Sequence, residues 1–274
     1  MKFERKLKIE KLYKNTYVIT DSGISIGSVN MYLLIGDESA LLIDSGYGGM
    51  DLHNVIGRVT TKPVICACTH GHLDHALGAS QFEKAYLHSN DGMIYQQHIS
   101  YDFIYSMGMD GIMNNSKMGK GYDIVLQEIA TAKHNPLKPI DDIPFFELGN
   151  RKVSWIRLPG HTQGSVAFFD EQYKTIFDGD GAPNGAWLFL KESSSLEDYI
   201  LTLNEYINYI KENGILKRYV GHMTNPVDIG QLNQLVKCAE FARDNPDKGK
   251  RINLSIGDVR EVLLGEILLF CKIT

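Results

Sequence analysis

The chain has 274 residues, of which 43% are hydrophobic and 22% charged, an ordinary composition for a globular protein. This length fits one α/β domain with a large core. The formal net charge of −5 disfavours nucleic-acid partners, because broad phosphate binding needs a basic surface. No run of about 18 apolar residues predicts a membrane span, and the charged start of the chain lacks the apolar segment of a secretory signal.

The four cysteines are too few for a disulfide framework in a chain of this length. Cys66 and Cys68 alternate along one predicted strand, so their side chains point to opposite faces and do not pair easily. We therefore expect reduced, buried thiols and a cytoplasmic location.

The first part of the chain reads as successive strands separated by turn sequences. The strands are expected at about 12–20, 29–35 and 40–43. A glycine-rich stretch at 46–49 then leads into a helix expected at about 50–59. Because this stretch lacks the Lys-Ser/Thr ending of a phosphate-binding loop, we interpret it as a turn.

A dense group of candidate metal ligands follows a short apolar strand predicted at 63–68. The run from Thr69 to His75 has the sequence THGHLDH, with four potential ligands in six positions. These are His70, His72, Asp74 and His75. Imidazole and carboxylate groups bind Zn²⁺-like cations, and sites without thiolates are more often catalytic because they leave a coordination position open. The run therefore predicts a catalytic metal site at the end of a strand.

Three further candidate ligands also follow predicted strands. They are His161 after a strand at 153–158, Asp180 after a strand at 174–177, and His222 after a short apolar strand. Glycines beside them permit tight turns that direct a side chain inward. Seven candidate ligands at four strand ends could therefore converge on one edge of a sandwich.

Residues 91–140 interrupt the alternation of strands and helices and are rich in Tyr and Met. A helix is expected at about 123–132. Such side chains suit an adaptable apolar pocket. We interpret the segment as a helical lid insertion, with Tyr101, Tyr105 and Met109 as candidate substrate contacts. A plain helical pair packed on the core is the alternative.

Two core-facing helices are expected near 198–211 and 229–243. The apolar segment 258–274 fits either a short helix ending near Gly265 or a pair of strands that turn there. It packs on the domain or forms a subunit contact, so a homodimer stays open. The histidines that match no ligand pattern are His53, His88, His98 and His134, of which His98 and His134 lie near enough to the insertion to reach a substrate.

Taken in order, these motifs resemble the metallo-β-lactamase-fold superfamily over roughly residues 17–222. The resemblance implies an α+β fold, a four-layer αβ/βα sandwich, and a single domain over 1–274 with the insertion at 91–140. It implies one metal on His70, His72 and His161, and a second on Asp74, His75 and His222. Asp180 would bridge the two metals, and Asp44 would support the site from behind. We prefer Asp180 to Asp178 because Gly179-Asp180 fits the family's Gly-Asp pair.

The resemblance further implies a dinuclear-metal hydrolase in which Asp74 orients a metal-bound hydroxide or relays its proton. Two divalent ions are expected, zinc first, with iron and manganese as alternatives. The β-lactamases of the superfamily usually carry Cys at the position of Asp180, so this chain looks more like the glyoxalase II-like and lactonase-like branch. Its expected substrate is a small-molecule ester, thioester or lactone. A basic motif for glutathione is not found near the carboxyl terminus, which disfavours glutathione thioesters.

Two other functions of the same fold remain alternatives. A phosphodiesterase or nuclease would use the same seven ligands, and the acidic net charge opposes it only mildly. An iron-dependent persulfide dioxygenase-like oxidoreductase would hold one iron on two His and one Asp.

Overall fold

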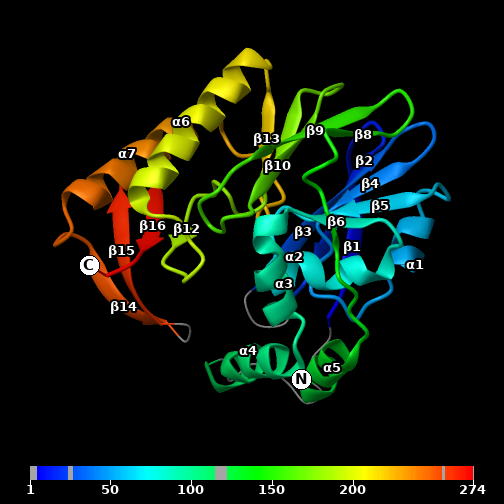
Figure 1. Cartoon of the computed structure of the whole chain (residues 1–274), viewed down its shortest axis with the longest axis horizontal. Coiled ribbons are helices and arrows are strands. Elements are labelled where there is room, and N and C mark those ends of the chain that lie inside the picture. The colour runs from blue at the N-terminus through cyan, green and yellow to red at the C-terminus, as the bar shows by residue number, and fades with distance from the viewer. Residues whose placement is uncertain (1–4, 24–26, 115–121, 255–256, 274) are drawn as a thin grey trace.

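The computed structural model describes residues 5–23, 27–114, 122–254 and 257–273, with the backbone alone for 108–114. Two sheets lie face to face at its centre (Figure 1). The first has seven strands in the order β1-β2-β3-β4-β5-β6-β7. They are β1 (Leu7–Tyr13), β2 (Thr16–Asp21), β3 (Val29–Ile35), β4 (Ala40–Ile43), β5 (Val64–Ala67), β6 (Ala85–Leu87) and β7 (Lys138–Pro139). Pairing is antiparallel up to β4 and parallel from there on.

The second sheet has five strands in the order β13-β11-β10-β9-β8. They are β8 (Phe145–Glu147), β9 (Lys152–Arg157), β10 (Val166–Asp170), β11 (Thr175–Phe177) and β13 (Lys217–Tyr219). Apolar side chains fill the space between the two sheets, with Tyr32 and Leu41 from the first packed among Phe146, Phe168 and Phe177 from the second. This shared core fixes the distance between the sheets, and so between the loops at their ends.

Helices cover the outer faces of both sheets. The helix α1 (Leu52–Gly57) packs on the first sheet with Leu42 and Cys66. The helices α6 (Leu196–Glu212) and α7 (Gln231–Asp244) pack on the second sheet, where Phe169 belongs to the same cluster as Leu203 and Leu235. The expected four-layer sandwich is therefore confirmed, and its helices lie within a few residues of the predicted ranges.

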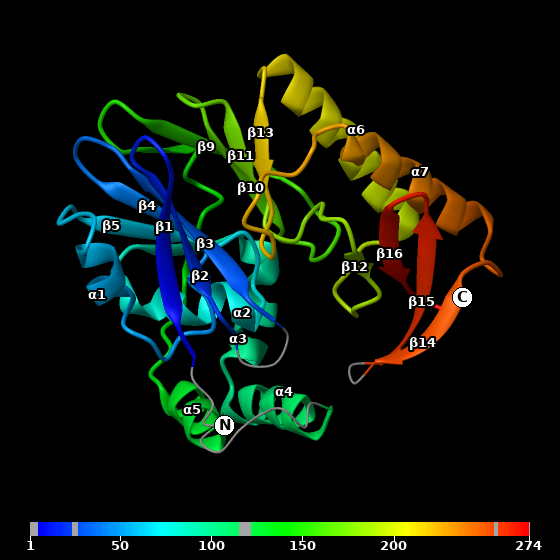
Figure 2. The same ribbon diagram turned by 180° about the vertical axis from the view of Figure 1, so that it is seen from behind.

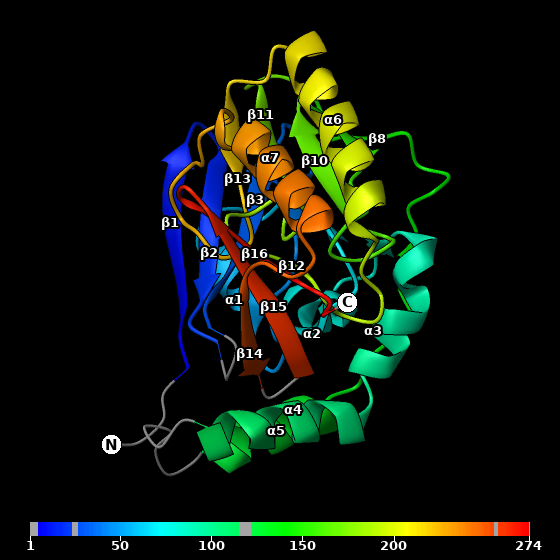
Figure 3. The same ribbon diagram turned by 90° about the vertical axis from the view of Figure 1, so that its left-hand side faces the viewer.

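A third, four-stranded sheet extends the fold beyond the expected layers. Its order is β12-β16-β15-β14. The strands are β12 (Ala186–Leu188), β14 (Lys250–Leu254), β15 (Gly257–Leu264) and β16 (Ile267–Cys271). One face packs on α7 (Figure 3), through Val262, Leu269 and Cys271. For the carboxyl-terminal segment the strand pair is thus right and the helix wrong, and Gly265 makes the turn at φ 62°.

The single strand expected at 12–20 is wrong, because the chain reverses within it. The strands β1 and β2 form a hairpin in which Tyr13 pairs with Thr16 across a two-residue turn. Asn15 adopts φ 51° there, a left-handed conformation that Asn tolerates better than most residues. The polar turn is short, and the apolar residues on both sides of it concealed the reversal of the chain.

The insertion is helical, as predicted. It contains α3 (Gly92–His98), α4 (Tyr101–Asn114) and α5 (Tyr122–Thr131). The last two lie beside each other below the main sheets (Figure 2). Ile104, Leu126 and Ile129 are buried with Tyr47 and Leu77, so the insertion packs on the main domain through a shared apolar cluster. Within the described ranges, no helix has the length and apolar character to cross a bilayer.

Arg151 joins the two main sheets through a set of buried hydrogen bonds. Its guanidinium donates to the Asp170 carboxylate at 2.6 Å and to the Thr16 hydroxyl at 2.6 Å. It also donates to the carbonyls of Asn15 and Ile35. Burial raises the pKa of Asp170, and Arg151 opposes that rise.

We predict that Arg151→Met lowers the free energy of unfolding by about 3–5 kcal/mol, because it leaves a buried carboxylate without its partner. Urea-induced unfolding measures the loss. Lys152→Met is the matched control, since the Lys152–Glu171 pair is largely exposed and contributes little. A smaller loss for Arg151→Met than for this control would contradict the prediction.

Candidate metal centre

The first ligand motif forms a loop and the first turn of a helix at the end of β5. The helix α2 (Leu73–Ala76) begins inside the motif. His70 and His72 therefore lie on the loop, whereas Asp74 and His75 lie on the helix. All four side chains are buried.

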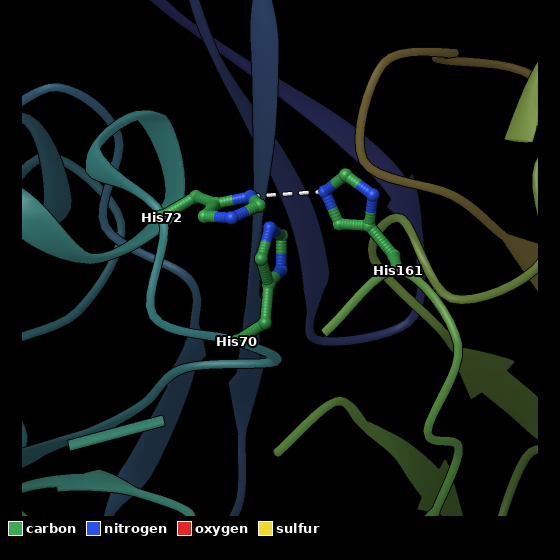
Figure 4. A group of neighbouring side chains, drawn as sticks. All are labelled: His70, His72 and His161. Atoms are coloured by element: carbon green, nitrogen blue, oxygen red, sulfur yellow. Dashed lines mark hydrogen bonds between the residues drawn. The ribbon is translucent and has the colours of Figure 1, made fainter. Parts of the chain in front are cut away.

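His70, His72 and His161 converge from two different loops (Figure 4). His161 lies between β9 and β10, in the second half of the sandwich. The ring centroid of His70 is 4.7 Å from that of His72 and 5.0 Å from that of His161. His72 Nδ1 is 2.9 Å from His161 Nε2. One nitrogen from each ring lies within 4.8 Å of the others, a geometry that could hold a metal ion.

Asp74, His75 and His222 form a second group of the same kind. Asp180 lies between the two groups. Its Oδ2 is 3.1 Å from His222 Nε2, 3.6 Å from His75 Nε2 and 3.8 Å from His161 Nε2. The structure therefore brings all seven candidate ligands together at one edge of the sandwich, although their binding of metal stays a prediction.

The ring nitrogens that face away from the centre are held by the surrounding protein. His161 Nδ1 donates to the Trp187 carbonyl at 3.0 Å, and His222 Nδ1 donates to the Ser28 carbonyl at 2.7 Å. His75 Nδ1 donates to the Asp44 carboxylate at 2.9 Å. Since a neutral imidazole carries one N–H, each inner nitrogen then presents a lone pair to the centre.

Asp44 organises the back of the site, where the resemblance placed it. It adopts φ 60° and accepts hydrogen bonds from the Thr69 amide at 2.7 Å and the Thr69 hydroxyl at 3.0 Å. Because that hydroxyl donates to Asp44, its oxygen is free to accept from His70 Nδ1 at 3.1 Å. One carboxylate thus orients both His70 and His75.

The inner atoms fit a bound cation. His70 Nε2, His75 Nε2 and Asp180 Oδ1 are buried without a hydrogen-bond partner among the described groups, and such atoms are costly unless a ligand satisfies them. His72 Nδ1 and His161 Nε2 present facing lone pairs at 2.9 Å, an arrangement that needs a proton or a cation between them. Burial, and then His72, lower the His161 pKa to about 4, which disfavours a proton on His161. The histidine and carboxylate donors match zinc-like ions.

The two groups have opposite proton affinities. Burial and the neighbouring histidines hold the pKa of His70 well below its ordinary value. In contrast, the Asp180 carboxylate raises the pKa of His222 to about 9. Burial opposes the charge on His75, but Asp74, Asp180 and Asp44 together raise its pKa well above the ordinary value. The second group therefore holds protons that a cation would displace.

Asp91 is a supporting residue that the sequence did not indicate. It is the last residue of a short 3₁₀ helix, 89–91, and it is fully buried. Its carboxylate accepts from the Gly71 amide at 2.9 Å, the Thr162 hydroxyl at 2.6 Å and the Gly164 amide at 2.7 Å. It therefore ties the loop of His72 to the loop of His161, and nothing in the sequence marks it among the other acidic residues.

Glu192 is the second supporting residue that the sequence did not indicate. Its Oε1 is 2.9 Å from His72 Nε2, and although burial opposes its charge, the bond to His72 holds its pKa down to about 2. On the other side, His98 stacks on His72 with ring centroids 5.0 Å apart, and Phe103 stacks on His98 at 4.0 Å. Burial, and then His72, lower the His98 pKa to about 3.

The other candidate residues from the sequence lie outside the group of seven candidate ligands. Tyr101 and Tyr105 are 46% and 37% exposed and stack on each other, while the Met109 side chain is outside the described part of the chain. Among the other histidines, His53 bonds to the Gln81 carbonyl and His134 to the Ile129 carbonyl, while His88 Nδ1 accepts from the Asn90 amide.

Asp178 lies at the start of the turn that carries Asp180, where its carbonyl accepts a hydrogen bond from the Gly181 amide at 2.9 Å. It pairs with the buried Arg218 at 2.7 Å. This pair anchors the loop that carries Asp180 two residues later.

The sequence model of the metallo-beta-lactamase superfamily matches residues 24–209. The chain belongs to this superfamily. It is 21% identical to the acyl-coenzyme A thioesterase MBLAC2 of Gallus gallus over 202 residues, which cover 70% of this chain and 72% of that protein. The Homo sapiens protein of the same name is 22% identical over 206 residues, with the same coverage. These relatives agree with the expectation of a metal-dependent hydrolase.

Solved structures of the superfamily show the same fold. The metallo-beta-lactamase from Pontibacter korlensis superposes with a TM-score of 0.60 at 17% identity, covering 86% of this chain and 99% of that one. At this identity the likeness concerns the fold alone.

We predict that the metal-free protein loses stability as the pH rises from about 6.5 to 9. The His222 pKa is raised to about 9 in the folded protein, so its contribution is complete below the unfolded value of about 6.5 and is lost as the pH rises through 9. Urea-induced unfolding in the presence of a chelator measures this slope.

His222→Ala should reduce the slope without abolishing it, because His75 contributes in the same direction. His53→Ala, which removes a histidine outside the cluster, should leave it unchanged. Stability that rises across this window in the unsubstituted protein would show the prediction to be wrong.

Proposed function

We propose that the chain is a dinuclear metal-dependent hydrolase that cleaves small-molecule acyl thioesters, with esters and lactones as the neighbouring substrate classes. The observation that supports this most directly is the pair of donor groups with Asp180 between them. His70, His72 and His161 would hold one ion, Asp74, His75 and His222 the other, and Asp180 would bridge them. Zinc is the expected metal, with iron and manganese as alternatives.

The chemistry that such ions supply is well defined. Two divalent cations at these positions would lower the pKa of water toward about 7 and withdraw charge from a substrate carbonyl oxygen.

Asp74 is the residue proposed to handle the proton. Its Oδ2 is 3.5 Å from His222 Nε2 and 3.6 Å from His75 Nε2, so it lies in the second donor group with its side chain 8% exposed. We assign it the orientation of the attacking water and acceptance of that water's proton at a carboxylate oxygen. The buried position keeps competing solvent away from this carboxylate.

A thioester suits this arrangement because its leaving group needs little help. Thiols have pKa values near about 8.5, so a thiolate can leave near neutral pH without a strong general acid. The printed name of the MBLAC2 relatives, acyl-coenzyme A thioesterase, points to the same class. A lactone or activated ester would also react at such a site.

Aromatic side chains beside the ligand cluster would contact the acyl part of the substrate. Trp187, whose carbonyl holds His161, is half-buried on β12 and packs with Phe189 and Phe270. On the other side, α4 carries Phe103 against His98. We propose that the insertion also contributes Tyr101, Tyr105 and Met109 to the wall of the pocket.

We predict that protein purified without chelators contains two metal ions per chain, and that Asp180→Ala loses at least one of them. Its thioesterase activity should fall by more than about 100-fold. This exceeds the loss typical of removing a residue that only hydrogen-bonds to a metal ligand. Metal analysis and assays on a thioester, ester, lactone and phosphodiester panel measure both effects. Asp244→Ala, an exposed substitution at the end of α7, is the control.

Retention of two metals and full turnover in Asp180→Ala would refute the bridging role. Turnover of the phosphodiester alone would favour a phosphodiesterase. One iron per chain, together with oxygen consumption on a persulfide, would favour the dioxygenase.

We predict that Tyr101→Ala, Tyr105→Ala and Met109→Ala reduce the preference for longer acyl chains while metal content stays constant. Each methylene group that loses its contact should lower kcat/KM about fourfold, since its burial contributes about 0.8 kcal/mol. Rates on a series of acyl lengths measure the preference. Met93→Ala, which removes a highly exposed side chain of α3, is the control. Lost folding with unchanged selectivity would mean that the insertion is only core packing.

A further inference from the structure

The orientation of His72 depends on a carboxylate from a distant part of the chain. Its inner Nδ1 faces His161, and its outer Nε2 faces a carboxylate that is 120 positions away in the sequence, on Glu192. By contrast, His70 is oriented by the residue next to it, Thr69. The carboxylate comes from the loop between β12 and α6, in the other half of the sandwich.

The identity of the outer partner decides which ring nitrogen points inward. A carboxylate only accepts hydrogen bonds, so Glu192 requires the N–H of His72 on Nε2 and leaves Nδ1 with its lone pair. If the ring turned over by 180°, a carbon would replace Nδ1 at the centre and the bond to Glu192 would be lost. The carboxylate therefore selects both the tautomer and the ring orientation.

His98 restrains the same ring from its face. The two rings are nearly parallel, at 12°, and His98 in turn lies against Phe103. His98 Nδ1 also accepts from the Leu73 amide at 3.1 Å, at the start of the helix that carries Asp74 and His75. A 180° flip of the His72 ring leaves the ring in the same plane, so stacking alone would permit it. His98 therefore complements Glu192 without replacing it.

The loop that carries Glu192 is fixed independently of His72. The Ser193 hydroxyl donates to the His161 carbonyl at 2.9 Å. The Gln163 side chain donates to the Ser194 hydroxyl at 3.0 Å. The carboxylate is therefore held in place by the same loop that supplies His161, which couples two ligands of one proposed metal ion.

We propose that Glu192 is a positioning residue for the metal ion on His70, His72 and His161, and that it sets the affinity of this ion by fixing His72. The proposal rests on the metal centre of the proposed function but not on the substrate. It assigns Glu192 no contact with the metal, because His72 lies between them.

The test measures Zn²⁺ binding rather than turnover. Competition with a chromogenic chelator should show that Glu192→Ala weakens one of two Zn²⁺ ions by about 10–100-fold, as loss of an outer carboxylate partner typically does. Glu192→Gln should lose less, since its amide oxygen still accepts from Nε2. Glu197→Gln, an exposed change in the first turn of α6, should have no effect.

Two further measurements separate positioning from general loss of structure. In the His161→Ala background, which already lacks the first ion, Glu192→Ala should add little, whereas in the His222→Ala background its full effect should persist. Long-range ¹H–¹⁵N spectra of the metal-free protein should show the Nε2–H tautomer of His72, and Glu192→Ala should shift it toward a mixture.

Unchanged Zn²⁺ affinity in Glu192→Ala, or an equal loss of both ions, would overturn the proposal. A third Zn²⁺ ion that disappears with Glu192 would also overturn it, because Glu192, His72 and His98 would then be ligands of their own site. Failure of every substrate in the hydrolase panel would leave the Zn²⁺ result standing, so the two proposals can fail separately.

Discussion

The candidate centre depends on hydrogen bonds to the outer nitrogens of its histidines. A buried imidazole presents a lone pair to a metal only if its single proton is held on the other side. In this chain that role falls to Asp44 for His75 and to the carbonyls of Trp187 and Ser28 for His161 and His222. Asp44 and Ser28 lie beside strands of the first sheet, and Trp187 lies on β12 of the third sheet. The metal geometry is therefore a property of the assembled fold.

This dependence explains why so many charged groups are buried at one edge. Asp91 and Asp44 are carboxylates inside the protein, each satisfied by amides or hydroxyls of the ligand loops. Arg151 performs the corresponding task away from the ligand cluster, where it bonds to both sheets. Buried charges of this kind add little net stability, but removing one partner is costly, so they resist any displacement of one half against the other.

The sequence indicated the candidate ligands because each belongs to a short local motif at the end of a strand. His70 to His75 lie in one run, and His161, Asp180 and His222 each follow an apolar strand beside a glycine. The partners of these ligands have no such signature. Asp91 and Glu192 act across 71 and 120 positions, and only the packing of the two halves brings them to the site.

The fold shows the same limit. The hairpin turn consists of two residues, Lys14 and Asn15, between two apolar stretches. The strand β12 has three residues and pairs in parallel with β16, more than eighty positions away. Both are decided by tertiary contacts rather than by periodicity. The four main layers were more predictable because most of their strands and helices follow one another closely in the sequence.

The same reasoning separates the chemistry of the site from its selectivity. The seven ligands are a feature of the superfamily and cannot identify a substrate, because one fold hosts many reactions. The stack from Phe103 through His98 to His72 connects α4 of the insertion to a candidate ligand. A substrate that displaced Phe103 would therefore act on the ring that Glu192 holds. Substrate fit in the insertion and metal geometry at the centre are thereby linked through one imidazole.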